Sequence, residues 1–161
     1  MRQLKKETFK GLRDAFHVIS VEELMEMMGG NDCVLQCYSY VSGHSVEWWA
    51  NTVQYNFGYN VYEEGSGGLQ TSDIVPLGAY GGLNVTDLGS VNTTQAVNSI
   101  SQKLANGQTV MMTFNSSSGP DHAVIVTSVN TSTNTVHWYD PSTKTTGSQS
   151  QGQWSGFYSL N

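Results

Sequence analysis

The order of helical and strand-like patterns along this chain constrains its fold most. Helical spacing or helix-start signals mark three segments beyond the first thirty residues: residues 33–41, the first part of 45–62, and 95–105. Strand-like patterns mark four later segments: residues 109–114, 122–129, 135–139 and 156–160. Helices early and strands late predict an α+β domain, with N-terminal helices packed on a small antiparallel sheet.

Two stretches carry weaker patterns. Residues 63–90 contain seven glycines and are expected to form loops around a short apolar stretch at residues 74–77. The tail beyond Ser142 is polar, and its only strand-like segment is the last one. The sequence thus predicts loops for residues 63–90 and no element between Ser142 and that last strand.

Charge is unevenly distributed along the chain. Five of its seven basic residues lie within the first thirteen positions, whereas the chain from Asn31 onward carries two lysines against eight acids and the whole net charge of -6. Binding to nucleic acid or to anionic lipid needs clustered Lys and Arg, so neither is expected as a partner. No apolar run approaches the ~20 residues that span a bilayer, so no stable membrane insertion is expected.

The first thirty residues form a unit of their own. Ser20 can cap a helix, with Glu23 as its capping-box partner three residues later. Leu24, Met27 and Met28 share one face of that helix. Gly29-Gly30 ends it and opens the backbone to solvent or to a protease cleft. We therefore divide the chain into a leader, residues 1–30, and one domain, residues 31–161, a length that suits a single hydrophobic core.

The two cysteines are expected to be free thiols. Cys33 and Cys37 lie four residues apart, so a disulfide between them would close almost no loop. Cys33 follows Asn31-Asp32, which can cap a helix, and a helix N-terminus lowers a thiol pKa. We therefore interpret Cys33 as a reactive thiolate and Cys37 as a core thiol, although free cysteines are often simply buried.

A histidine and an aspartate follow in an order that suits a cysteine nucleophile. His122 opens a predicted strand and Asp140 ends the next one, so pairing of the two strands would bring the side chains together. Such a nucleophile needs a histidine base and a third group that orients the imidazole. Alternatively His122 is structural, and Asp140-Pro141 is a common strand-ending turn. The remaining histidines lack metal-like spacing with the cysteines, so neither a metal nor another cofactor is expected.

Four motifs carry a resemblance to a known family. They are Asp32-Cys33-Val-Leu-Gln-Cys37, Leu104-Ala-Asn-Gly-Gln-Thr-Val110, Asp121-His122-Ala-Val-Ile-Val126 and Val136-His-Trp-Tyr-Asp140-Pro141. In this order they resemble the papain-like bacteriocin-processing cysteine peptidases, which cut double-glycine leaders. The resemblance covers residues 31–141 and implies a papain-like domain with Cys33 as nucleophile, His122 as general base and acid, and Asp140 as orienting group. It also implies a peptide or protein substrate.

The sequence departs from that family at two positions. Val34 stands where the family has a glycine after the nucleophile. Met27 stands where the family has a glutamine, six residues before the nucleophile, that donates to the oxyanion. Loss of one such donor typically lowers turnover ~100–1000-fold.

The leader carries a resemblance of its own, to double-glycine leaders of exported bacterial peptides. The residues that match are Ile19, Ser20, Glu23, Leu24 and Met27, followed by Gly29 and Gly30. The resemblance implies recognition by a leader-processing export transporter, cleavage after Gly30, and a mature protein that is secreted or periplasmic and begins at Asn31.

Three hypotheses about function therefore stand side by side. The first is an exported papain-like cysteine peptidase or related acyl-transfer enzyme. The second is a catalytically degenerate exported effector, bacteriocin-like or signalling, that keeps the fold. The third is a structural or binding module that uses the aromatic side chains of residues 45–62.

Overall fold

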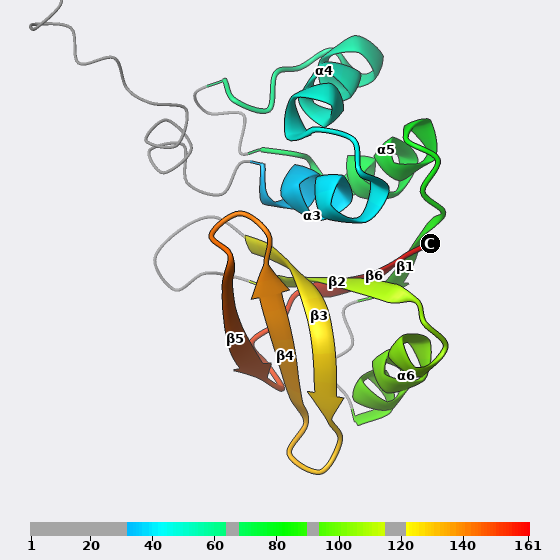
Figure 1. Ribbon diagram of the computed structural model, residues 1–161, viewed down its shortest axis with the longest axis vertical. Helices are drawn as coiled ribbons and strands as arrows, with labels where there is room; N and C mark the ends of the chain where they lie inside the picture. The colour runs from blue at the N-terminus through cyan, green and yellow to red at the C-terminus, as the bar shows by residue number, and fades with distance from the viewer. Residues whose placement is uncertain (1–31, 64–67, 90–93, 115–121) are drawn as a thin grey trace, which may run out of the picture.

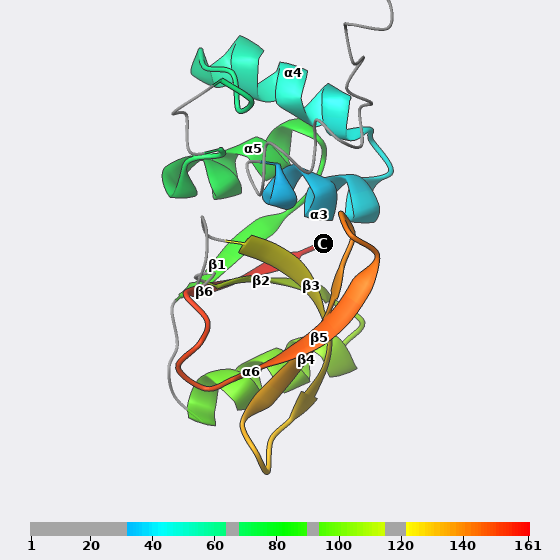
Figure 2. The ribbon, with the colours of Figure 1, turned by 90° about the vertical axis from the view of Figure 1, so that its left-hand side faces the viewer.

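The architecture of the chain is α+β, with one six-stranded antiparallel sheet between helices on both faces (Figures 1 and 2). The computed structural model describes residues 32–63, 68–89, 94–114 and 122–161. Within these residues, the three helices that precede the first strand cover one face of the sheet, and one later helix covers the other. The predicted fold class is confirmed.

The first two described helices match the expected segments. They are α3 (Cys33–Ser42) and α4 (Val46–Phe57). Each ends at a glycine in the left-handed region, Gly43 with φ 78° and Gly58 with φ 81°, where a side chain would be strained. Ser45 caps α4, because its side chain accepts a hydrogen bond from the Trp48 N–H. No helix in the described ranges is both long and apolar enough to cross a membrane.

The expectation of loops throughout residues 63–90 is wrong in two places. A short 3-10 turn, η1 (Thr71–Asp73), leads into helix α5 (Ile74–Tyr80), and strand β1 (Val85–Gly89) follows. Ile74 and Leu77 are buried in the core, and Gly78 lies so close to Val85 that a Cβ there would overlap its side chain. Tertiary packing thus stabilises elements whose glycine content indicates loops.

The remaining elements are one helix and five strands. They are α6 (Thr94–Ala105), β2 (Thr109–Phe114), β3 (His122–Asn130), β4 (Thr135–Asp140), β5 (Thr145–Ser150) and β6 (Gly156–Leu160). The strand order is β1-β6-β2-β3-β4-β5. The sequence did not predict β5, because it is polar. It forms an edge strand against β4, where pairing needs no apolar face.

The sheet separates two hydrophobic cores. Met111, Ile125 and Tyr158 point to the side of α3, α4 and α5. Their neighbours in the same strands, Met112, Val124 and Phe157, point to the side of α6. This alternation follows from the two-residue period of a strand, and it explains why β2 and the first half of β3 are apolar except at Thr109, Thr113 and His122.

The register between β3 and β4 shifts by one residue in mid-strand. Ile125 pairs with Tyr139 and Val126 with Trp138, but Ser128 pairs with His137, so Thr127 is an extra residue in β3. We call the part of the ladder before Thr127, where β3 begins and β4 ends, the inner side of the shift. There, even-numbered residues of the two strands share one face. On the outer side, between Thr127 and the β3–β4 turn, odd-numbered residues of β3 share that face with even-numbered residues of β4.

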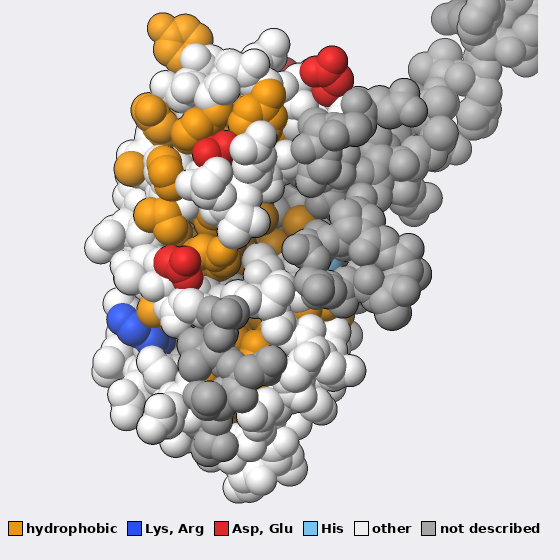
Figure 3. Space-filling model, turned by 180° about the vertical axis from the view of Figure 1, so that it is seen from behind, with side chains coloured by type: hydrophobic (Ala, Val, Ile, Leu, Met, Phe, Trp, Pro, Cys, Tyr) orange, Lys and Arg blue, Asp and Glu red, His pale blue; other side chains and the backbone are white. Residues whose placement is uncertain are grey.

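Aromatic and aliphatic side chains remain exposed on the helical half of the molecule. Figure 3 shows hydrophobic side chains gathered in a band over the region of the N-terminal helices. Tyr55 of α4 is 90% exposed and Tyr80 of α5 is 53% exposed. Phe57 meets the Tyr80 ring edge to face, with 6.0 Å between centroids. Tyr55 and Phe57 belong to residues 45–62, the segment that the binding-module hypothesis names, whereas Tyr80 lies outside it.

The contact between Gly81 and Trp49 gives a test of the helical core. Trp49 is fully buried, and a Cβ at Gly81 would overlap its six-membered ring. Gly81 has φ -96°, so alanine meets no backbone strain there. We expect Gly81→Ala to lower the free energy of unfolding in urea by about 1–3 kcal/mol through overpacking. Adding Trp49→Phe should make the loss smaller than the sum of the two single losses. Additive losses would show that the ring is not the obstacle.

Candidate active site

Cys33 lies at the first position of α3, the helix that packs on β3. Only 6% of the residue is exposed. Its thiol accepts a hydrogen bond from the main chain of Ala123, the residue directly after His122. Ala123 is the residue of β3 that faces the helical core here, and its small side chain lets the start of α3 approach the strand. The predicted nucleophile therefore adjoins the start of β3.

Asp32 precedes α3 but does not cap it with its side chain. Its Oδ2 instead accepts a hydrogen bond from Gln36 Nε2 at 3.1 Å. Burial raises the pKa of Asp32, the hydrogen bond from Gln36 opposes that rise, and the charges of Asp140 and His122 act in opposite directions. Asp32 is thus within electrostatic reach of both residues. It also leaves the first N–H groups of α3 without a cap from its side chain.

His122 and Asp140 form the predicted pair. His122 Nε2 lies 2.9 Å from Asp140 Oδ2, and the two side chains are 25% and 5% exposed. The register places them on one face of the sheet, because both have even numbers and lie inside the register shift. In Figure 1, β3 begins and β4 ends at the side of the sheet nearest α3. The interpretation of Asp140-Pro141 as a turn is also correct, because residues 141–144 connect β4 to β5.

Asp140 is ionised at neutral pH. Burial raises the pKa of its carboxyl, but hydrogen bonds from Thr143, His122 and Ser142 more than offset this, so the pKa lies below its ordinary value. An ionised carboxylate only accepts hydrogen bonds, so the proton between the two side chains belongs to His122 Nε2. In a neutral imidazole, Nδ1 is then the basic nitrogen.

An aromatic wall covers one side of this pair. Phe114 lies opposite His122 in the β2–β3 ladder, and its ring meets the imidazole edge to face at 5.5 Å between centroids. The Trp138 ring also contacts Phe114, at 5.9 Å between centroids. Low polarity around a charged hydrogen bond strengthens it, so the wall stabilises the His122–Asp140 contact.

The pKa of Cys33 does not follow the expectation. Burial raises it to about 11, the charges of Asp32 and Asp140 add to the rise, and the hydrogen bond from Ala123 only partly opposes it. The predicted lowering by the helix N-terminus is therefore outweighed by desolvation, and the resting thiol is neutral at pH 7. Cys37 is fully buried, as expected for a core thiol, and burial raises its pKa as well.

Part of the predicted site lies outside the described residues. This holds for the leader positions, which are Ile19, Glu23, Leu24, Met27, Gly29 and Gly30. The boundary at residue 30, the leader function and export consequently stay predictions. Sequence reasoning missed two groups beside Asp140, namely Thr143 and the Ser142 N–H. The pattern Asp-Pro-Ser-Thr offered a signal for them, because such turns fold their N–H groups onto the aspartate side chain.

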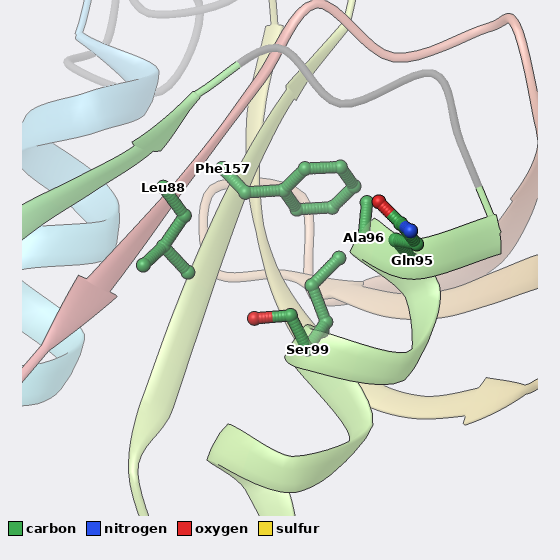
Figure 4. Close-up of a pocket in the computed structure, with 6 residues that line it drawn as sticks. Leu88, Gln95, Ala96, Ser99 and Phe157 are labelled. Atoms are coloured by element: carbon green, nitrogen blue, oxygen red, sulfur yellow. The ribbon is translucent and has the colours of Figure 1, made fainter.

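The described ranges contain no cluster of three or more His, Cys, Asp or Glu side chains arranged for a metal ion. A pocket of about 200 Å³ lies on the α6 side of the sheet (Figure 4), away from α3. Its walls are Leu88, Gln95, Ala96, Ser99, Ile100 and Phe157. None of these six side chains is an acid or a base, so the described walls hold no group that could activate the Ser99 hydroxyl.

Comparison with known proteins identifies the fold. No protein-family model matches this sequence, and no curated protein matches it either. Among solved structures, the chain is similar to the peptidase domain of Streptococcus ComA, a bi-functional ABC transporter involved in a quorum-sensing pathway. The TM-score is 0.54 at 17% sequence identity, over 81% of this chain and 90% of that domain. The chain therefore has the fold of that peptidase domain.

Proposed function

We propose that this chain is an exported papain-like cysteine peptidase, a thiol hydrolase with Cys33 as nucleophile, His122 as general base and acid, and Asp140 as orienting group. The observation that carries the proposal is the His122–Asp140 hydrogen bond at the start of β3, beside the residue that binds the Cys33 thiol. The similarity to a peptidase domain supports it. The substrate is a peptide or a protein, and no cofactor takes part.

The first step is attack of the Cys33 sulfur on the scissile carbonyl carbon. A thiol with a pKa of about 11 is almost fully protonated at neutral pH, so its proton must leave as the C–S bond forms. His122 Nδ1 accepts that proton, for which the sulfur and Nδ1 must meet across the start of β3. The ionised Asp140 stabilises the imidazolium that results.

The second step breaks the peptide bond. The carbonyl oxygen carries a negative charge in the tetrahedral intermediate, and the Cys33 N–H at the uncapped start of α3 can donate to it. The imidazolium returns its proton to the leaving amine as the C–N bond breaks, which leaves a thioester on Cys33. Water then attacks the thioester, with His122 acting again as base and then as acid.

Export is the other half of the proposal. Residues 1–30 act as a double-glycine leader, in which Ile19, Glu23, Leu24 and Met27 are recognised by a processing transporter. Cleavage after Gly30 releases a secreted or periplasmic protein. The support for this part is the leader pattern and the concentration of basic residues in the first thirteen positions.

A second candidate function is a catalytically degenerate effector with the same fold. The burial of the Cys33 thiol favours it, and so does Met27 in place of the oxyanion glutamine. The two candidates differ in one property of Cys33: only the enzyme needs His122 to activate the thiol.

Alkylation of the full chain with iodoacetamide separates the two candidates. We expect His122→Ala to slow modification of Cys33 at pH 7.5 about tenfold or more, because the thiol then lacks a base. The difference should shrink as pH rises toward the thiol pKa of about 11, since the thiolate then forms without help. Peptide mapping by mass spectrometry measures the rates.

The matched control for this experiment is His137→Ala, in the exposed part of β4. It should leave the alkylation rate of Cys33 unchanged at every pH. Equal rates in wild type and His122→Ala near neutral pH would rule out the enzyme and favour the degenerate effector.

Leader processing is tested on protein secreted by the native host. Mass spectrometry should find Asn31 as the first residue in the medium. Leu24→Asp should block cleavage, because it places a charge on the apolar face that the transporter recognises. Secreted protein with residues 1–30 intact, or retention of the unprocessed chain inside the cell, would refute this part.

A further inference from the structure

Asp140 is held by a hydroxyl group that the catalytic proposal has not used. Its Oδ2 accepts two hydrogen bonds, one from His122 Nε2 at 2.9 Å and one from Thr143 Oγ1 at 2.8 Å. Its Oδ1 accepts from the N–H groups of Ser142, at 2.8 Å, and Thr143, at 3.4 Å. The oxygen of Asp140 that contacts His122, Oδ2, is therefore also held by the Thr143 hydroxyl.

We propose that Thr143 is a positioning residue, which fixes the Asp140 carboxylate in the orientation that keeps a proton on His122 Nε2. It acts through Asp140 and does not touch the substrate. The inference rests on the proposed function, because it names a further residue of the same site.

The direction of the hydrogen bonds follows from the chemistry of the groups. Thr143 Oγ1 has one proton, and the ionised carboxylate of Asp140 takes it. Thr143 Oγ1 also lies 2.8 Å from Thr145 Oγ1. Because the Thr143 proton is already in use, Thr145 must donate in that contact. The hydroxyls thus form a chain of donors that runs from Thr145 through Thr143 to Asp140.

A second hairpin in the same sheet shows what the turn requires by itself. The β3–β4 connection reads Asn130-Thr-Ser-Thr-Asn-Thr135, and the β4–β5 connection reads Asp140-Pro-Ser-Thr-Lys-Thr145. Both pair their end residues and place the fifth residue in the left-handed region, with φ 50° at Asn134 and 58° at Lys144. In both, the first side chain accepts from the N–H groups of the third and fourth residues.

The two turns differ in what the hydroxyl of their fourth residue does. Thr133 Oγ1 lies 3.0 Å from Thr135 Oγ1, as its counterpart Thr143 does with Thr145. Only Thr143 also donates to the first side chain of its turn, at Oδ2 of Asp140. Because the β3–β4 turn forms with no such bond to Asn130, folding of the turn does not require it. The bond acts on the oxygen that holds His122.

The charges around Asp140 explain why a further donor matters. The charge of Asp140 raises the pKa of Asp32 and of Cys33, at the start of α3, while burial raises the pKa of Asp140 itself. His122 on β3 and the two donors in the turn favour ionisation. Removing the Thr143 hydroxyl leaves the effect of burial on Asp140 less opposed, so the pKa of Asp140 should rise.

The test compares Thr143→Val with Thr133→Val in the full chain. Two readouts are independent of turnover: the ¹⁵N shifts of the His122 ring, which report the protonated nitrogen, and the ¹³C titration of the Asp140 carboxyl. For Thr143→Val we expect the Asp140 titration to move to higher pH by roughly 0.5 to 1. In a fraction of the molecules, the ring proton of neutral His122 should move from Nε2 to Nδ1. Thr133→Val should change neither, and Thr143→Ser should restore both.

Alkylation of Cys33 provides the functional readout. Thr143→Val should slow it about threefold to tenfold at pH 7.5, with a larger effect at lower pH as Asp140 becomes protonated. Unchanged His122 and Asp140 spectra in Thr143→Val would overturn the positioning role. A different outcome would confirm the positioning role but refute the proposed peptidase. In that outcome Thr143→Val alters the His122 and Asp140 spectra, while wild type and His122→Ala are alkylated at equal rates.

Discussion

The pairing of β3 with β4, including its one-residue shift, is the constraint on which the site depends. Inside the shift Ile125 pairs with Tyr139, which places His122 and Asp140 on the same face of the sheet. If the outer register continued to the end of the ladder, the two side chains would point to opposite faces. The shift also lets Val129 and Val136, beyond it, pack with the α6-side core. Because of the extra residue Thr127, Val129 and Val136 both pack in the core while His122 and Asp140 still share a face.

Burial raises the pKa of both acidic groups of the site, but hydrogen bonds reverse the shift in only one of them. Asp140 is desolvated but surrounded by four hydrogen-bond donor groups, so its pKa falls and it remains a carboxylate. Cys33 is desolvated with weaker compensation and faces two carboxylates, so its pKa rises. The Cys33 thiol therefore keeps its proton in the resting state. In the proposed mechanism, nucleophilic activity of the thiol therefore depends on His122.

The turn between β3 and β4 ends at Thr135, and the turn between β4 and β5 ends at Thr145. Their backbones and main hydrogen bonds correspond, and both use a polar side chain at the end of a strand to hold the turn. The second hairpin begins with a charged residue and lies beside His122. The same local structure therefore holds a turn in one place, and in the other it also holds the carboxylate that His122 contacts.

The sequence by itself determined the fold class, the helix that begins at Cys33, the strands that begin at His122 and end at Asp140, and the order of these residues. Periodicity and capping are local, so the chain displays them directly. Only the tertiary structure decided that α5, β1 and β5 form, because packing and edge pairing outweigh the glycines and polar residues there. It also decided the register that joins His122 to Asp140 and the sign of the Cys33 pKa shift. Register and desolvation depend on residues distant in sequence, and no local pattern records which of them will meet.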